Sequence, residues 1–412
     1  MTRLPPQPWI HAAPTRRVLD ALEAEGGEGC ARFVGGAVRN ALMGLEVADV
    51  DIATPLTPER VIAALKRADI RAVPTGIEHG TVTAVADHAP FEITTLRRDV
   101  STDGRNATVA FSTDWAEDAM RRDFRLNALY ADREGTVFDP VGGGVKDALA
   151  GRIVFVGDAE TRIREDYLRI LRFFRFFAWY GRGEPDAAAL AACAGLKDGM
   201  VRLSAERVSK ELLKTLAAPD PRAAVRLMDR TGVLRRVVPR PDLTRFEAMV
   251  PLGTDPLLRL SAVLPDEREE VAALASGLRL SNEERDRLLA ALPDRERVDL
   301  DLTPPQARAA LYRLGARTFA DRVTRLWAEA GPQGEARARA LLTLARDWTR
   351  PRFPLGGAEV AALGVSPGPE TGRLLKAAEA WWIENDFPEH GARERLADLA
   401  GRLPPQGGEG DA

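Results

Sequence analysis

The strand signals of this chain are confined to its first third. β-branched and aromatic runs bounded by Gly, Pro and Asp fall between residues 31 and 150 and comprise Arg32-Phe33-Val34, Val50-Asp51-Ile52, Thr81-Val82-Thr83-Ala84-Val85 and Phe91-Glu92-Ile93-Thr94-Thr95. From Asp158 onward the apolar residues recur with a period of about 3.6, which is typical of amphipathic helices. This segregation predicts a compact head that contains both strands and helices, followed by helices alone.

Glycine and proline positions divide the chain into three expected domains. These positions separate residues 1–151, 152–240 and 241–412, and the last two of these segments are expected to be helical. Charge is uneven over these parts, because residues 152–240 carry 18 Lys or Arg against 11 Asp or Glu, a net +7, whereas the rest of the chain sums to −10. A basic segment on an acidic protein suits one polyanionic partner bound in one place.

The composition excludes several classes of protein. Cys30 and Cys193 are the only cysteines, too few for a disulfide framework or a thiolate zinc site. No apolar run approaches the roughly 20 residues that span a bilayer, and the first residues lack the apolar stretch of an export signal. We therefore expect a cytoplasmic protein without redox chemistry and without a membrane partner.

Asp49 and Asp51 form an Asp-x-Asp pair within a predicted strand. Residues two apart on a strand point to the same face, so both carboxylates can reach one hard cation. Magnesium prefers oxygen ligands and completes its octahedron with waters and substrate phosphates, which indicates a metal-held nucleoside triphosphate. Glu92, in another predicted strand, is a candidate third acid, and an ordinary solvated glutamate is an equal alternative. Chance also produces such pairs, as at Asp299-Leu300-Asp301.

A glycine pair distinguishes the first of these Asp-x-Asp pairs from the second. Gly35-Gly36 follows the first expected strand, and Arg39 lies in the first turn of the next expected helix, ten residues before Asp49. Two glycines let backbone amides approach a phosphate closely, and a guanidinium adds a fixed positive charge. Nothing similar precedes Asp299. The pattern indicates a phosphate-binding turn beside the carboxylates.

The sequence resembles a known family over most of its length. The segments that carry the resemblance are Phe33-Val34-Gly35-Gly36-Ala37-Val38-Arg39-Asn40-Ala41-Leu42-Met43-Gly44, Asp49-Val50-Asp51-Ile52-Ala53-Thr54, Arg121-Arg122-Asp123-Phe124-Arg125-Leu126-Asn127-Ala128-Leu129, Asp139-Pro140-Val141-Gly142-Gly143 with Asp147, and Glu165-Asp166-Tyr167-Leu168-Arg169-Ile170-Leu171-Arg172. They resemble class II tRNA nucleotidyltransferases and bacterial poly(A) polymerases. The resemblance implies an α+β fold with a polymerase-β-like nucleotidyltransferase head of a small mixed sheet and helices over residues 1–151. It also implies an all-α neck over 152–240 that selects nucleotides and binds RNA, and an all-α body and tail over 241–412 that bind tRNA. Asn40 departs from the family's usual Asp, which puts a supporting hydrogen bond in doubt rather than metal binding.

The resemblance also implies roles for two further segments. Arg122 and Asp123 resemble the family element that grips the triphosphate and the ribose, since a guanidinium suits phosphate oxygens and a carboxylate accepts from a 2′-hydroxyl. A helix-end charge cluster after Glu117-Asp118 is the competing interpretation. The polar stretch over residues 96–110, with Gly104 as a hinge, resembles the family's flexible loop.

Four polar residues spaced by three, Asp166, Arg169, Arg172 and Arg175, can line a groove along one side of a predicted helix. In the resembling family this motif selects the base, so the resemblance assigns base recognition to Asp166 and Arg169 and nucleotide binding to Arg172 and Arg175. The alternative is a solvated basic stripe with an i,i+4 pair from Glu165 to Arg169.

A hydrogen-bond code explains how one Asp and one Arg can select two bases. Cytosine and adenine both present an amino donor beside a ring-nitrogen acceptor, which match a carboxylate and a guanidinium. Uracil and guanine present the reverse pattern, a mismatch of about 1 to 3 kcal/mol per contact. Such a pair would choose C and A without a nucleic-acid template.

These observations predict a CCA tRNA nucleotidyltransferase that adds C, C and A to the tRNA 3′ end from CTP and ATP. Two Mg²⁺ ions on Asp49 and Asp51, with Glu92 beside them, are expected to activate the primer hydroxyl and stabilise pyrophosphate. The partners are expected to be tRNA and the two nucleotides, and not DNA. A poly(A) polymerase, an enzyme that adds only CC or only A, and a non-catalytic RNA-binding protein remain alternatives, although Val73–Gly80 resembles the tRNA enzymes.

Overall fold

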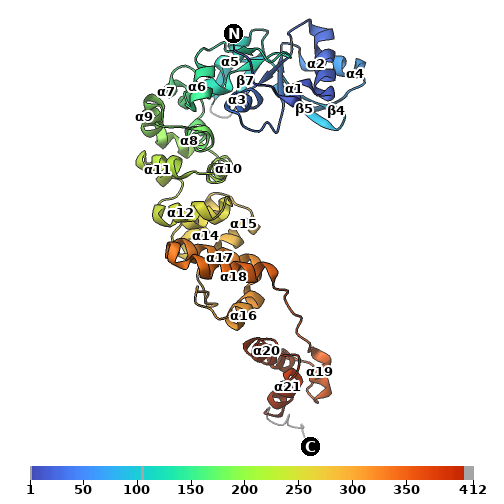
Figure 1. The fold of residues 1–412 in the computed structure, drawn as a ribbon, viewed down its shortest axis with the longest axis vertical. Helices are drawn as coiled ribbons and strands as arrows, with labels where there is room; N and C mark the ends of the chain where they lie inside the picture. The colour runs from blue at the N-terminus through green and yellow to red at the C-terminus, as the bar shows by residue number, and fades with distance from the viewer. Residues whose placement is uncertain (1, 104–105, 403–412) are drawn as a thin grey trace, which may run out of the picture. The chain divides into compact units, whose positions relative to one another are not determined.

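The computed structural model describes residues 2–103 and 106–402, so the expected hinge residue Gly104 lies outside the described residues. The chain forms two compact units, Met1–Pro239 and Arg240–Ala412, whose elements are labelled in Figure 1. The expected division into head, neck, and body with tail stays a prediction. None of the helices within the described ranges combines the length and the apolar character that a bilayer crossing requires.

A mixed sheet of seven strands forms the centre of the head, in the order β3-β4-β5-β2-β1-β8-β9. Its strands are β1 Arg32–Val34, β2 Asp51–Thr54, β3 Arg71–Gly76, β4 Thr81–Ala86, β5 Ala89–Thr95, β8 Tyr130–Ala131 and β9 Val137–Phe138. β2 and β5 run parallel, and the other neighbouring pairs in this described sheet are antiparallel. The predicted mixed sheet is confirmed, and β1, β4 and β5 coincide with expected strands.

The two faces of this sheet differ in what they bury. The helices and 3₁₀ turns of the head are α1 Pro8–His11, α2 Ala13–Gly26, α3 Gly36–Met43, η1 Ile77–His79, α4 Pro58–Arg67, α5 Trp115–Met120, η2 Arg125–Asn127 and α6 Gly144–Ala150. Ile52 lies in register with Phe33 and Ile93, and this face packs against α1, α2 and α4. Asp51 and Glu92 also lie in register with each other. Because neighbours along a strand alternate, they belong to the opposite face, where Ala119 of α5 and Ala128 after η2 pack with the apolar residues.

Two expectations about the head are wrong. The strand expected over Val50–Ile52 begins at Asp51, so Asp49 precedes it. The polar stretch expected as a flexible loop is instead an antiparallel hairpin of β6 Arg97–Asp103 and β7 Asn106–Phe111. Backbone hydrogen bonds hold such a hairpin regardless of side-chain polarity, so hydrophobic patterning gives no signal for it.

The helices that follow the head in the first unit pack against it through phenylalanines. They are α7 Ala159–Glu165, α8 Leu168–Tyr180, α9 Ala187–Leu196, α10 Ala205–Leu216 and α11 Arg222–Arg230, with the 3₁₀ turns η3 Lys197–Arg202 and η4 Leu234–Arg236. Phe124 of the head is fully buried, and its ring centroid lies 4.9 Å from both that of Phe155 and that of Phe176 in α8. Phe173 of α8 lies against the same rings. The aromatic cluster fixes α8 on the head.

A buried carboxylate joins three further elements of the head. Asp118 of α5 is 1% exposed and accepts hydrogen bonds from the Arg121 and Arg122 guanidinium groups and the Tyr130 hydroxyl of β8. Its Oδ1 also accepts from the backbone N–H of Arg97, the first residue of the hairpin, at 3.3 Å. Burial alone would raise the pKa of Asp118, yet the charges of Arg122 and Arg121 and the Tyr130 hydrogen bond lower that pKa to about 2.

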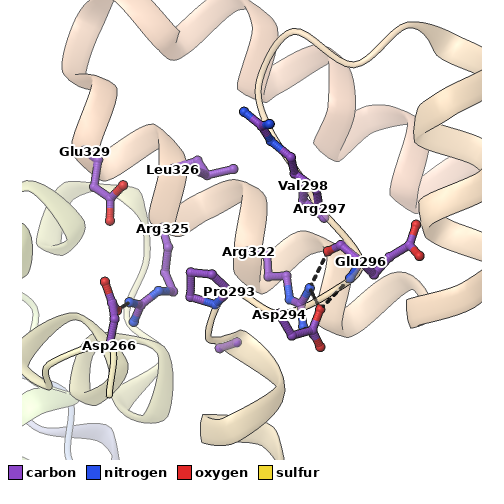
Figure 2. A pocket seen from close by; sticks show the side chains of 11 residues that line it. Asp266, Pro293, Asp294, Glu296, Arg297, Val298, Arg322, Arg325, Leu326 and Glu329 are labelled. Atoms are coloured by element: carbon purple, nitrogen blue, oxygen red, sulfur yellow. Dashed lines mark hydrogen bonds and ion pairs between the residues drawn. The ribbon is translucent and has the colours of Figure 1, made fainter. Parts of the chain in front are cut away.

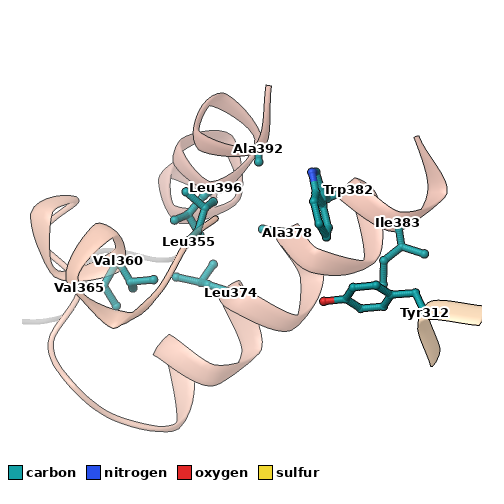
Figure 3. Close-up of a cluster of buried hydrophobic side chains, with 10 residues drawn as sticks. All are labelled: Tyr312, Leu355, Val360, Val365, Leu374, Ala378, Trp382, Ile383, Ala392 and Leu396. Carbon is teal, nitrogen blue, oxygen red and sulfur yellow. The ribbon is translucent and has the colours of Figure 1, made fainter. Parts of the chain in front are cut away.

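The second unit is helical throughout its described residues. Its elements are α12 Leu243–Met249, η5 Val250–Leu252, α13 Pro256–Val263, α14 Arg268–Gly277, α15 Asn282–Ala291, α16 Pro304–Leu314, α17 Ala316–Ala330, η6 Gly331–Gly334, α18 Glu335–Asp347, α19 Gly357–Ala362, α20 Pro369–Glu384 and α21 Ala392–Gly401. Near its end, Trp382 of α20 packs with Leu374 and Ala378 of the same helix, Leu396 of α21 and Tyr312 of α16 (Figure 3). The predicted absence of strands from the rear half holds for residues 240–402.

Replacing Phe124 by Ala should destabilise the first unit by about 3 to 5 kcal/mol, since the cavity would lie among rings that cannot collapse onto it. Urea unfolding followed by circular dichroism measures the change. Phe111→Ala is a matched control, because the Phe111 side chain is 42% exposed and should cost far less. Equal losses in both variants would contradict the assigned role of the cluster.

The Asp118 carboxylate should make stability depend on pH. A pKa of about 2 in the folded state against 3.8 in a model compound contributes stability that is complete above about pH 5 and is lost as the pH falls toward 2. The difference in unfolding free energy between the wild type and Asp118→Asn should therefore shrink by about 1 kcal/mol between pH 7 and pH 3. Urea titrations at both pH values test this, and an unchanged difference would contradict the ion-pair assignment.

Candidate active site

The three predicted carboxylates form one negatively charged group on the sheet. Asp51 opens β2 in register with Glu92 of β5, and Asp49 lies two residues before Asp51 and is exposed. Burial, then the like charges of Glu92 and Asp49, raise the pKa of Asp51 to about 6, while the charge of Arg122 opposes this rise. The carboxylates therefore interact with one another and with a guanidinium from α5's end.

The glycine turn lies directly beside that guanidinium. Gly35 has a φ of 64°, in the region that favours glycine, and precedes α3, which begins at Gly36. A Cβ atom at Gly35 would lie 3.5 Å from Nη1 of Arg122. Arg122 uses Nε and Nη2 on Asp118, so its Nη1 edge faces the turn. The glycine turn and the Arg122 guanidinium thus lie beside each other, an arrangement that suits a phosphate ligand.

The Arg39 guanidinium already donates hydrogen bonds to several protein side chains, which leaves few donors for a phosphate. Arg39 lies in α3, is 7% exposed, and donates to the side chains of Asn40, Asn127 and Tyr180. Asn40 itself donates through Nδ2 to the carbonyl of Glu46, at 2.8 Å. An aspartate could not donate this bond, so the effect of Asn40 in place of the family's usual Asp stays a prediction. The phosphate role of Arg39 stays a prediction.

Asp123 links the head to α8. Its Oδ1 accepts from the Phe124 backbone at 2.8 Å and from Asn127 at 3.0 Å, and its Oδ2 accepts from Nε and Nη2 of Arg172. Burial raises the pKa of this carboxyl, but the Arg172 charge and the Asn127 hydrogen bond outweigh burial and lower the pKa overall. A carboxylate offers about four lone-pair positions, so a ribose hydroxyl would have to share or displace one of these donors.

The predicted base-selecting residues lie along α8 and the turn before it. Arg169, Arg172 and Arg175 belong to α8, but Asp166 precedes the helix in an extended conformation with φ −152°. The expectation that all four residues share one helix is therefore wrong at Asp166. Oδ1 of Asp166 accepts from the N–H of Leu168 at 3.0 Å, which fixes the carboxylate at the helix start.

The helix α10 lies beside α8 (Figure 1), and its side chains are partners of this row. Arg207 donates to Oδ2 of Asp166 at 2.6 Å, and Glu211 accepts from Nε of Arg175 at 2.6 Å. Arg169 instead donates to Glu165 and to backbone carbonyls, that of Arg162 at 2.7 Å among them. The pair from Glu165 to Arg169, foreseen as the alternative to base recognition, is thus present.

Several residues of the site escaped sequence reasoning. Asp118, Asn127, Arg207 and Glu211 all hold predicted site residues in place. The i,i+4 spacing of Asp118 and Arg122 was a usable signal. Asn127 lies four residues after Asp123, but its contact with Arg39 and the contacts of the two α10 residues join parts that are distant in sequence and leave no local signal.

The residues present fit a divalent cation only in part. Within residues 2–103 and 106–402, no three His, Cys, Asp or Glu side chains are grouped so that they could hold a metal ion by themselves. Asp49 and Asp51 offer the oxygen donors that Mg²⁺ prefers, and Mg²⁺ commonly binds one or two carboxylates while keeping waters and substrate oxygens. The like charge that raises the pKa of Asp51 is charge that a cation would neutralise.

The second unit contains a cavity of about 140 Å³ between α15, α17 and the loop after α13 (Figure 2). None of the predicted site residues lines it. Two of its arginines are almost completely buried and bound to protein acceptors: Arg322 to Asp294, and Arg325 to Asp266. These ion pairs hold the surrounding loops together.

Two family models match the chain. The model described as "Poly A polymerase head domain" matches residues 31–154, which include the sheet and its carboxylates. The model described as "Probable RNA and SrmB- binding site of polymerase A" matches residues 184–244, which include α10. Both matches fall within or at the edge of the first unit.

The full chain also has relatives of similar length. It is 35% identical over 371 residues to CCA tRNA nucleotidyltransferase 1, mitochondrial, of Mus musculus, covering 86% of this chain and 83% of the relative. It is 33% identical over 382 residues to the CCA-adding enzyme of Lacticaseibacillus paracasei, covering 90% and 92%. The solved structure of the Bacillus stearothermophilus CCA-adding enzyme in complex with CTP matches with a TM-score of 0.72 at 27% identity, covering 95% and 98%. The resemblance carried by the sequence motifs is confirmed, and the chain belongs to the family of CCA tRNA nucleotidyltransferases, the CCA-adding enzymes.

Proposed function

We propose that this protein adds C, C and A to the 3′ end of tRNA from CTP and ATP, without a nucleic-acid template. The observation that carries the proposal is the union of two features in one unit. Asp51 and Glu92 lie in register on one sheet face, and the Asp123–Arg172 ion pair joins that head to α8. Such an enzyme needs a group of carboxylates for nucleotidyl transfer and a helix with polar side chains for base recognition.

The carboxylates are proposed to serve the chemical step. Asp49 and Asp51 would hold Mg²⁺, with Glu92 as a third acid beside it. Bound Mg²⁺ makes the primer 3′-hydroxyl a better nucleophile and stabilises the pyrophosphate leaving group. The Gly35-Gly36 turn and Arg122 would bind the triphosphate, and they supply fixed donors and positive charge where negative charge gathers during the reaction.

Base recognition is proposed to rest on Asp166 and Arg169, with Arg172 and Arg175 nearer the rest of the nucleotide. Asp166 Oδ2 and the Arg169 guanidinium are both bound to protein side chains, Arg207 and Glu165. An incoming base would exchange these contacts for its own amino group and ring nitrogen. Such an exchange keeps both side chains hydrogen-bonded before and after binding, so neither is left as an unsatisfied polar group.

The alternative enzymes would share this head domain and would differ in the product that they make. A poly(A) polymerase would use the same carboxylates with a different primer and would reject CTP, and an enzyme that adds only CC or only A would use one nucleotide. The relatives named CCA tRNA nucleotidyltransferase and CCA-adding enzyme, which the chain matches over most of its length, favour full CCA addition to tRNA. RNA contacts in the second unit are proposed to read shape and phosphates.

Incubating the purified protein with tRNA that lacks its last three nucleotides tests the function. With CTP alone we expect two added nucleotides, with ATP alone none, and with both a three-nucleotide extension that stops at A. Products are resolved on a sequencing gel. Long A tails without C incorporation would identify a poly(A) polymerase, and a product that stops after CC with both nucleotides present would identify a partial activity.

An Asp51→Ala variant should lose at least about 1000-fold in incorporation rate, since several kcal/mol of charge stabilisation correspond to tenfold per 1.36 kcal/mol. Asp301→Ala is a matched control from the second Asp-x-Asp pair and should retain full activity. Single-turnover incorporation of CMP measures both. Full activity of the Asp51 variant, with an unchanged circular dichroism spectrum, would show that the metal assignment is wrong.

A further inference from the structure

The sequence predicts a phosphate contact for Arg39, but its side chain is directed to other parts of the protein. Nη1 donates to Oδ1 of Asn127 at 2.6 Å, and Nη2 donates to the Tyr180 hydroxyl at 2.9 Å and to Oδ1 of Asn40 at 2.8 Å. Nε donates to the same Asn40 oxygen at 3.0 Å. A guanidinium has five N–H donors, so one at most remains for a ligand. With 7% of the residue exposed, Arg39 is a poor candidate for direct phosphate binding.

Two of these contacts lead to the same helix. Tyr180 is the last residue of α8, and the guanidinium carbon of Arg39 also lies 4.0 Å from the centroid of its ring. Asn127 donates to Asp123, which in turn accepts from Arg172 of α8. Arg172 and Tyr180 are separated by about 12 Å along the helix. A helix held at two such points cannot tilt on the head without breaking one of them.

α10 also holds α8. Arg207 and Glu211 of α10 pair with Asp166 and Arg175, before and within α8, and Glu211 also lies 4.0 Å from Nη1 of Arg172. The helix that carries the proposed base-selecting side chains is therefore fixed to both α10 and the head. Arg39 is the residue of the head that both touches α8 directly and reaches it through Asn127.

The Arg39 guanidinium also connects to the segment that leads to the carboxylates. Asn40 accepts from Arg39 with Oδ1 and donates with Nδ2 to the Glu46 carbonyl at 2.8 Å. An aspartate at this position has no N–H and would leave the carbonyl without this donor. The pair of Arg39 and Asn40 therefore joins the segment before Asp49 to the end of α8.

We propose that Arg39 is a positioning residue that sets base selectivity by fixing α8, and not a ligand of the substrate phosphates. The inference rests on the proposed function, in which Asp166 and Arg169 recognise the base. Selection depends on two hydrogen bonds of correct direction, and displacement by about 1 Å is enough to weaken such positioned contacts. A loosened α8 would bind C and A less well and would exclude U and G less well.

The test compares Arg39→Lys and Tyr180→Phe with the wild type. The quantity measured is kcat/KM for CTP and for UTP on tRNA that lacks its last three nucleotides. Lysine keeps the positive charge but cannot bridge three acceptors, so the CTP-to-UTP preference should fall at least about tenfold. Tyr180→Phe keeps the ring and loses one hydrogen bond, so the preference should fall by about two- to tenfold.

A phosphate ligand would behave differently. Lysine would then largely replace arginine as a point charge, any loss would appear as a higher KM for all nucleotides alike, and Tyr180→Phe would retain the wild-type preference. Tyr312→Phe is the matched control, because it also removes one hydroxyl hydrogen bond, to Glu379 at 2.6 Å in the second unit. It should leave the preference unchanged.

The outcomes separate the inference from the function on which it rests. If Arg39→Lys fails to fold, as judged by thermal unfolding, Tyr180→Phe alone decides. A wild type that prefers CTP together with a Tyr180→Phe variant of unchanged preference overturns the inference and leaves the function intact. A wild type that incorporates neither CMP nor AMP overturns the proposed function itself, and the inference with it.

Discussion

A carboxylate without water around it must be surrounded by donors, because burial of an unpaired charge costs several kcal/mol. The buried carboxylates of the first unit include Asp118 and Asp123, which lie on either side of Arg122 in the sequence. Asp118 accepts hydrogen bonds from two arginines, a tyrosine and the backbone N–H at the start of the β6–β7 hairpin. Asp123 accepts hydrogen bonds from Asn127 and Arg172. These two groups connect the sheet, the hairpin and α8.

This arrangement explains why one segment contributes to several parts of the site. Arg122 faces the glycine turn because Asp118 occupies its other edge. One residue later, Asp123 faces α8. A short stretch after α5 thus turns first toward the glycine turn and then toward α8. The same arrangement gives Asp51 a neighbouring positive charge that offsets part of the repulsion from Glu92 and Asp49.

Sequence reasoning succeeded where local patterning carries the information. Alternation in β4 and β5 and the glycines after β1 are local, and they predicted strands and a glycine turn in the head, whereas the resemblance implied the mixed sheet. Sequence reasoning failed where backbone pairing decides alone, as in the β6–β7 hairpin, and at element ends, as with Asp49 before β2 and Asp166 before α8. Asp166 leaves the helix because its own side chain accepts from the N–H of Leu168, an interaction that spacing does not reveal.

The sequence by itself determined the fold class, the family and the residue types available for chemistry, since these follow from periodicity and from contiguous motifs. Only the tertiary structure decided which charged side chains are already bound to other protein groups. Arg39 and Tyr180, or Arg175 and Glu211, are 141 and 36 residues apart, and no local pattern says that a side chain free to bind a ligand in one fold is already satisfied in another. Pairing of buried charges depends on distances in space, and therefore it is settled by packing.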